Sequence, residues 1–314
     1  MKNYIQKYLV CALLVMGYTK MHAQQQPNFL LFESNMSIIN PAYTGVNGSL
    51  LGLQYRTAWM GVEDAPRIAS FNYHTREKNK ASWGINFLSD QIYVENQGYA
   101  SIDYSYRLDV SETTKLRLGI KAGGMFNNID VNKLNRVVSE NNPTLTGVNN
   151  YINPLIGLGA YLENDHNFFG ISIPNILNTK RYKEIEGVQT TATDRPHVYI
   201  SGGLNIGLYK EDLSFRPVML YRVVKDAPSL LTVMAKLDYK DAVEFGVGLT
   251  NNDYMSASFL IKGYNNLDLG LGYEFAQRKG LASLRENTME FVLRYRFENK
   301  ANNDTRSQAE ATND

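Results

Sequence analysis

The sequence has a single cysteine and, after its first residues, no long apolar run. Cys11 lies in an apolar stretch near the N-terminus, so the rest of the 314-residue chain cannot form a disulfide. A chain of this length buries enough apolar surface to fold without one. No run of about 18 apolar residues follows that stretch, and the sequence therefore predicts no helical membrane span.

The first residues have the layout of a secretory signal peptide. Lys2 and Lys7 form a basic start, Leu9–Gly17 form an apolar centre, and Ala23 offers a small residue for cleavage. The apolar centre is too short to cross a membrane as a helix. We therefore expect residues 1–23 to be removed as a signal peptide, which makes Gln24 the first residue of the mature chain.

Excess positive charge is missing as well. The signal peptide contains Lys2, Lys7 and Lys20 and no acidic residue, so the mature chain has fewer basic residues than its 31 acidic ones. Nucleic-acid binding selects a basic face. We therefore expect no nucleic-acid partner.

Residues that carry catalytic or metal chemistry are sparse. Of the 4 histidines, His22 belongs to the signal peptide, and His74, His166 and His197 lack the spacing of metal ligands. No Gly-x-Ser-x-Gly elbow occurs, and the nearby Ser70 has no special spacing to His74. The sequence therefore predicts no catalytic residue, no metal site and no cofactor, and hence no enzyme.

Paired glycines occur at residues 157–159, 246–248 and 270–272. A phosphate-binding loop would need a helix N-terminus directly after the glycines. Here the glycines lie within extended segments and alternate with large apolar residues. Tight packing on an inner face and strand bending explain them better than a ligand does.

Alternation between apolar and polar residues is the main feature of the chain. In "TKLRLGIKAG", Leu116 and Leu118 fall on one face, while Lys115 and Arg117 fall on the other. A period of two indicates a β-strand, because successive side chains point to opposite faces. About fourteen such segments follow one another, at residues 48–59, 65–75, 80–90, 97–108, 114–126, 151–162, 168–177, 196–207, 213–224, 228–239, 242–250, 254–263, 266–275 and 287–297.

The length and spacing of these segments indicate a membrane barrel. Segments of about ten residues suit a tilted membrane crossing, whereas soluble strands are nearer five or six residues. Short polar turns alternate with longer connections, of which 127–150 and 178–195 are the longest. The sequence thus predicts an all-β fold, a transmembrane antiparallel up-and-down β-barrel over residues 48–297, with short periplasmic turns and longer extracellular loops. A large soluble β-sandwich is the alternative.

The two faces of the predicted strands differ in chemistry. Aromatic residues near strand ends suggest interfacial girdles, and they are Trp59, Trp83, Tyr104, Tyr106, Tyr161, Phe168, Phe169, Tyr239, Tyr273, Phe275, Tyr295 and Phe297. Charged residues fall on the inward face, at Lys115, Arg117, Lys121, Glu244, Asp268, Glu274, Glu290, Arg294 and Arg296. Such charges need partners or water, and the pattern leaves open whether the lumen is water-filled or plugged.

Two segments flank the predicted barrel. Residues 24–47 are too irregular for a barrel strand, and Asn40 and Pro41 begin a turn there. We expect this lead-in or plug segment to pack across the periplasmic mouth. Residues 298–314 are polar, acidic and without periodicity, which predicts a disordered periplasmic tail.

The stretch "NPAYTG" at residues 40–45, followed by "YRTAWMGVEDAPRIASFNYH", carries the most specific signal. It resembles the PorP/SprF family of type IX secretion membrane proteins, in which an N-P-A-Y-x-G turn precedes an R-x-x-W-x-G…A-P pair of strands. The matching residues are Asn40, Pro41, Ala42, Tyr43, Gly45, Arg56, Trp59, Gly61, Ala65 and Pro66. The resemblance is sharpest over residues 27–110 and continues as a strand pattern to Phe297.

The resemblance implies a barrel in the outer membrane of a Gram-negative bacterium that serves type IX secretion and, in many members, gliding motility. Besides the lipid bilayer, it implies two kinds of partner. One is a secreted adhesin or other cargo with a C-terminal targeting domain, and the other is the set of periplasmic secretion lipoproteins. Such a role needs no catalytic residue. The charged inner face leaves a passive porin or specific uptake channel as the alternative.

The surroundings of the motif give a more local expectation. We expect Arg56 and Arg67 to pair with Glu63 or Asp64, and Trp59 to lie at the outer interface. These residues could serve the structure or contact a partner, and the sequence does not decide between the two. Other partner contacts are expected on the long outer loops.

Overall fold

The computed structural model describes residues 29–93, 95–129, 151–185, 188–209, 212–251, 254–264, 266–276 and 287–297. The predicted signal peptide and the predicted tail lie outside these residues, as do residues 130–150 of a predicted outer loop.

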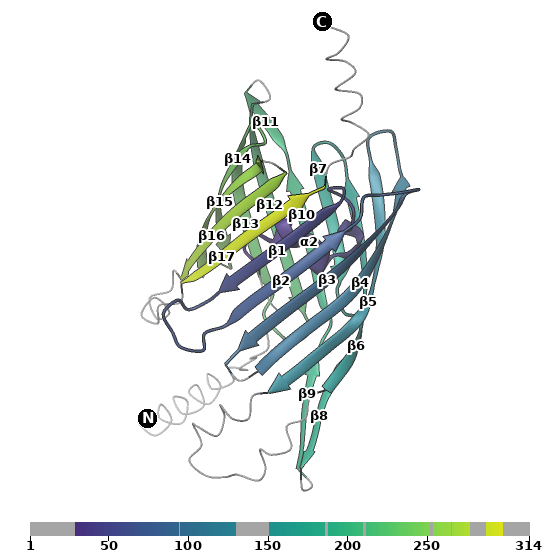
Figure 1. The fold of residues 1–314 in the computed structure, drawn as a ribbon, viewed down its shortest axis with the longest axis vertical. Helices are drawn as coiled ribbons and strands as arrows, with labels where there is room; N and C mark the ends of the chain where they lie inside the picture. Colours follow the sequence, from purple (N-terminus) through teal and green to yellow (C-terminus); the bar gives the residue numbers. More distant parts are fainter. Residues whose placement is uncertain are drawn as a thin grey trace, which may run out of the picture.

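Fifteen strands form one antiparallel sheet in the order β10-β7-β6-β5-β4-β3-β2-β1-β17-β16-β15-β14-β13-β12-β11 (Figure 1). β10 (His197–Leu204) and β11 (Ile206–Tyr209) both pair with β12 (Leu213–Val224), so they are two halves of one crossing, and the sheet closes into a barrel of fourteen crossings. The other strands are β1 (Leu50–Thr57), β2 (Arg67–His74), β3 (Ala81–Ile92), β4 (Glu95–Asp109), β5 (Lys115–Ile129), β6 (Tyr151–Glu163), β7 (Asn167–Ile173), β13 (Leu230–Tyr239), β14 (Val243–Thr250), β15 (Tyr254–Tyr264), β16 (Leu267–Ala276) and β17 (Thr288–Arg296).

The first strand closes the barrel by pairing with the last. The β1–β17 register runs from Leu50 opposite Arg296 to Thr57 opposite Met289. Closure removes the free sheet edge, so the backbone amides of the wall can find partners within the bilayer. The predicted transmembrane barrel is therefore confirmed.

One element was absent from the prediction. Within the expected outer loop 178–195, β8 (Thr179–Ile185) and β9 (Val188–Asp194) form a hairpin that is a separate two-stranded sheet. The hairpin projects beyond the barrel at the lower end of Figure 1. Its sequences, "TKRYKEI" and "VQTTATD", are polar on both faces, so they lack the apolar alternation that identified the other strands.

Exposure alternates along the wall as the sequence predicts. In β14, Val247 is 63% exposed toward the lipid side, whereas Glu244 is 1% exposed on the luminal side. The inward position of Asp268 and Glu290 is likewise confirmed, since both are 0% exposed. The barrel thus presents an apolar outer face and a polar lumen.

The assignment of Tyr161 and Phe168 to an outer girdle is wrong. Tyr161 is buried in the lumen, where its ring lies edge-on to Tyr43 at 5.2 Å and stacks on Phe168 at 5.6 Å. Both rings share the inward face with Gly159 and Gly170, their neighbours two residues away. By contrast, Trp83 is exposed on the outer face, as expected for a girdle residue.

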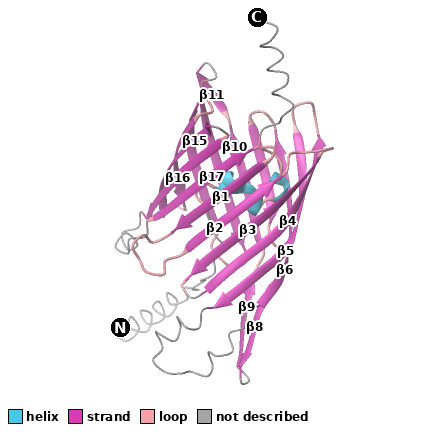
Figure 2. Cartoon of the chain, viewed as in Figure 1, coloured by secondary structure: helices cyan, strands magenta, loops and turns pink. Residues whose placement is uncertain are grey.

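The lumen contains three short helices, η1 (Phe32–Asn35), α2 (Met36–Ile39) and η2 (Pro41–Tyr43), drawn in cyan in Figure 2. They belong to residues 29–47, which we call the luminal segment. We expected the lead-in to cover the periplasmic mouth, but its described part crosses the lumen instead. The reason is its apolar character, because its side chains pack against inward-facing wall residues, namely Phe29, Leu30, Phe32, Met36 and Ile39 against Ile68, Leu88, Tyr199, Val218, Leu220 and Met234.

None of the helices in the described part of the chain is long and apolar enough to cross a membrane.

The outer face gives a test of membrane depth. We expect Val247→Arg to destabilise the barrel in lipid by about 2–4 kcal/mol, because a charge on the lipid-facing side near mid-strand must enter hydrocarbon. Val110→Arg is a matched control, since Val110 is 60% exposed but lies in the short turn after β4, where the cost falls to about 0–1 kcal/mol. Urea unfolding in liposomes measures both variants. Equal costs would contradict the placement of the bilayer around β14.

Candidate functional site

The first residues of the luminal segment are bound to β17 through their backbone. The amide nitrogens of Leu30 and Leu31 donate to the two carboxylate oxygens of Glu290, at 2.8 and 2.7 Å. Glycines at 270 and 272 of β16 provide the space, since a Cβ at Gly272 would lie 2.7 Å from the Leu30 side chain. The wall is therefore shaped to receive this part of the segment.

Arg56 is part of the same cluster. It lies directly opposite Glu290 in the β1–β17 register, and its guanidinium contacts Glu290 at 3.2 Å and Glu274 at 2.8 Å. The expected pairing of Arg56 with Glu63 or Asp64 is therefore wrong. In β1 the side chain of residue 56 points into the lumen, whereas residues 63 and 64 lie in the connection after the strand. The contacts of Arg56 thus indicate a role in the structure of the barrel.

The remaining motif residues after β1 lie in the outer connection between β1 and β2. Trp59 and Gly61 have positive φ values of 50° and 88°, and Trp59 is 43% exposed. Ala65 is buried at 6% exposure, and Pro66 accepts a hydrogen bond from the amide of Ala58 at its carbonyl. Glu63 and Arg67 are exposed, and Asp64 is half-buried.

The turn "NPAYTG" binds the second half of the luminal segment to the barrel wall. The Asn40 side chain caps η2 by accepting from the Ala42 amide at 3.0 Å, and it donates to the Ala160 carbonyl of β6 at 3.1 Å. Pro41 occupies the first helical position, where its missing N–H costs nothing. Gly45 has a φ of 84° and donates its amide to the His74 ring at 3.3 Å.

Small wall residues accommodate this turn. A Cβ at Gly119 of β5 would lie 2.1 Å from the Ala42 nitrogen, and one at Gly159 of β6 would lie 2.0 Å from the Asn40 side-chain oxygen. Both glycines at 157–159 are therefore tightly packed, as the sequence indicated: Gly159 meets the luminal segment, whereas Gly157 meets the backbone of Pro174.

Ser70 and His74 also serve the luminal segment. Ser70 accepts a hydrogen bond from the Asn35 side chain, and His74 accepts one from the Gly45 amide. These side chains therefore hold the segment rather than each other. Within the described residues, no three His, Cys, Asp or Glu side chains gather as metal ligands would.

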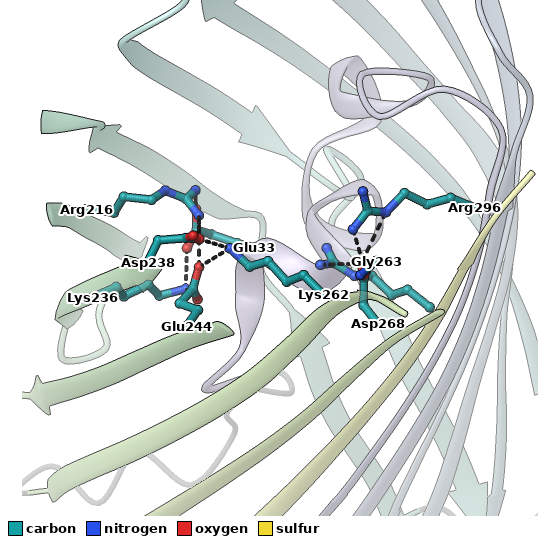
Figure 3. A network of polar contacts seen from close by, with 10 residues as sticks. Glu33, Arg216, Lys236, Asp238, Glu244, Lys262, Gly263, Asp268 and Arg296 are labelled. Carbon is teal, nitrogen blue, oxygen red and sulfur yellow. Dashed lines mark hydrogen bonds and ion pairs between the residues drawn. The ribbon is translucent and has the colours of Figure 1, made fainter. Parts of the chain in front are cut away.

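Glu33 joins the luminal segment to a buried network of charges (Figure 3). It pairs with Lys236 and, at 3.2 Å, with Arg216; both cations also contact Glu244, at 3.1 and 2.9 Å. Burial acts to raise the pKa of Glu33, but Lys236 and Arg216 lower it by more, so the pKa lies below the ordinary value of 4.5. Glu33 is therefore held as a carboxylate.

A second charged pair lies on the other side of the lumen. Lys121 contacts Asp103 at 2.9 Å and donates to the Ser37 carbonyl at 3.2 Å, while the Ser37 hydroxyl donates to Asn86 at 3.0 Å. The luminal segment is thus bound to opposite walls of the barrel.

The sequence patterns did not single out Glu33, Ser37 or Gln54, which all contribute to the luminal contacts; Gln54 does so by donating to Glu290. Glu33 had a usable signal, because it is the one acidic residue in the apolar stretch "FLLFESNM". A charge at such a position needs a partner when the stretch is buried.

A family model described as "Type IX secretion system membrane protein PorP/SprF" matches residues 21–295. The chain belongs to the PorP/SprF family of type IX secretion system membrane proteins. It is therefore an outer-membrane protein of type IX secretion, and family membership implies association with the secretion machinery and its cargo. In this family member, the described ion pairs and hydrogen bonds bind the luminal segment to the barrel wall.

Solved structures of other barrels are similar in fold. The KdgM porin is 9% identical with a TM-score of 0.40, over 79% of this chain and 99% of that one. Omp33 of Acinetobacter baumannii is 8% identical with a TM-score of 0.45, over 80% and 99%. The CymD monoaromatic hydrocarbon channel is 11% identical with a TM-score of 0.48, over 85% and 93%. No curated protein matches the chain.

The Arg56 cluster predicts a loss of stability. Arg56→Gln leaves the buried carboxylates of Glu274 and Glu290 without their cation, which typically costs about 3–5 kcal/mol. Arg67→Gln is the control, because Arg67 begins β2 at an exposed position. Urea unfolding of the refolded barrels measures the difference. A variant at position 56 as stable as wild type would contradict the structural role.

The glycine contacts predict displacement of the luminal segment. In Gly119→Ala the new methyl group would meet the backbone of Ala42, so the segment must shift, at a cost of about 1–3 kcal/mol. Gly98→Ala is the control, because its nearest contact is an ordinary 3.8 Å. Ion conductance in planar bilayers should rise for the first variant only. Equal conductance in both would show that the segment does not depend on Gly119.

Proposed function

We propose that this protein is a closed, non-enzymatic barrel of the type IX secretion system that helps to export secreted proteins or to hold them at the cell surface. The luminal segment gives the best support. Its apolar side chains pack against the wall in the middle of the lumen, where the cavity beside Phe29 measures about 60 Å³. A lumen occupied in this way suits an adaptor that offers its two ends to partners rather than a pathway for solutes.

The proposed partners differ between the two ends. The short turns face the periplasm, where we place the secretion lipoproteins. The long connections face outward, where we place a gliding adhesin or another cargo with a C-terminal targeting domain. The hairpin β8–β9 supports an outer contact, because a two-stranded hairpin is marginally stable alone in water and a bound partner would stabilise it.

A passive porin or specific uptake channel is the alternative function. The charged inner face suggested it, because hydrated charges suit a channel. In the structure these charges contact one another and the luminal segment, as Arg56 contacts Glu274 and Lys121 contacts Asp103. They therefore give a channel less support than they did in the sequence alone.

Secretion and conductance can be measured on the same variants. Deleting the gene should abolish surface display of one or a few large secreted proteins, and the purified barrel should show no stable open conductance in planar bilayers. A copy in which a short Gly-Ser linker replaces residues 179–194 should assemble but fail to restore display. The same linker in place of residues 225–229, another outer connection, is the control and should restore it.

Two results would count against the proposal. Unchanged display after deletion of the gene would remove the secretion role. Stable conductance of the wild-type barrel, together with normal display in the hairpin variant, would favour the channel.

A further inference from the structure

A cavity of about 440 Å³ lies at the short-turn end of the lumen. The luminal segment lines it with Tyr43 and Asn47, and the turn between β6 and β7 lines it with residues 164–167. Its volume lies in the range of small-molecule sites, about 300–1,000 Å³. The contacts that hold the luminal segment do not fill this space.

One wall of this cavity is basic. Arg294 and Arg296 of β17 line it, and both contact the same carboxylate, Asp268 of β16. Figure 3 shows the contact of Arg296 with Asp268. The Arg294 contact measures 2.9 Å, and Asp268 also accepts from the Gly263 amide at 2.8 Å. Two guanidinium groups and one backbone amide therefore share a single buried carboxylate. With one carboxylate facing two guanidinium groups, this group of three side chains carries one net positive charge.

The other acidic residues of the cavity do not balance that charge. Glu33 and Glu244 are both bound by Lys236 and Arg216, and Glu244 is also bound by Lys262. Glu163 is bound by Arg117 at 2.9 Å.

Two further acids, Asp165 and Asp241, lie on exposed turns at the rim of the cavity. The Nε of Arg294 is buried and has no hydrogen-bond acceptor among the described residues. The wall at Arg294 and Arg296 thus has one net positive charge beyond Asp268 and one N–H donor, the Nε of Arg294, without an acceptor among the described residues.

We propose that this cavity binds an anionic group, a carboxylate or a phosphate, at Arg294 and Arg296. A guanidinium presents paired N–H donors in a fixed plane that matches the oxygens of either group. The anion balances the excess charge that Asp268 leaves, and the cavity has room for the molecule that carries it. This inference goes beyond the proposed secretion function and does not depend on it.

Two sources can supply the anion. One is a small anion from the periplasm. The other is the chain itself, because the residues after Phe297 include Glu298, Asp304, Glu310 and Asp314. The chemistry is the same in both cases, and truncation after Phe297 separates them.

The test measures the melting temperature of the full-length barrel in detergent while inorganic phosphate replaces chloride at constant ionic strength. A small-anion site gives a rise that grows with the logarithm of the phosphate concentration and reaches about 5 °C at concentrations far above Kd. A site occupied by the acidic end of the chain gives that rise only after truncation. Arg294→Gln should abolish the rise in either case. Arg195→Gln, an exposed arginine paired with Asp226 at the outer end, should keep it.

Arg296→Gln is the second variant if Arg294→Gln fails to fold, because Arg296 is 43% exposed at its side chain and its loss removes less buried structure. It should reduce the rise at least twofold. The proposal is overturned if neither the full-length nor the truncated chain responds to phosphate more than to chloride. It is also overturned if the variants at 294 and 296 respond as fully as wild type.

Discussion

The pair of Arg56 and Glu290 spans the seam that closes the barrel, and the arrangement of the lumen depends on it. The two residues lie directly opposite each other in β1 and β17. Glu290 is completely buried, and its two oxygens also accept the amides of Leu30 and Leu31. A single carboxylate therefore couples closure of the wall to placement of the luminal segment. Loss of Arg56 would leave the buried Glu290 carboxylate without its cation.

Apolar burial and ion pairing have different roles in holding the luminal segment. A fully buried Leu, Ile, Phe or Met side chain contributes about 1.5–3 kcal/mol, and the segment buries five such residues in the main cluster. A buried ion pair is often no more stable than a well-packed apolar pair, because desolvation offsets the attraction. Apolar burial therefore supplies most of the free energy that holds the luminal segment in the lumen. The Glu33 and Glu290 contacts instead fix the register, since each fits only one set of partners.

The sequence predicted the wall much better than its contents. Alternation along β5 or β16 depends only on neighbouring residues, so the period of two located each crossing. The partners of Arg56 are 218 and 234 residues away in the chain, and no local pattern encodes such distances, so the nearer Glu63 and Asp64 were chosen wrongly. Tyr161 was misassigned because an aromatic residue near a strand end fits a girdle equally well. The polar hairpin β8–β9 carried no apolar signal at all.

The pairing of charges in the lumen changes along the axis of the barrel. The luminal segment therefore has different surroundings in the middle of the lumen and at the short-turn end. Deep in the lumen each described cation that contacts the segment, such as Lys121 or Lys236, has a carboxylate within ion-pairing distance. The segment and the wall pack together there, and the cavity beside Phe29 measures about 60 Å³. At the short-turn end the segment leads into β1 and leaves a cavity of about 440 Å³ beside Arg294. The luminal segment therefore occupies the middle of the lumen and leaves a recessed cavity, lined by Arg294 and Arg296, at the periplasmic end of the barrel.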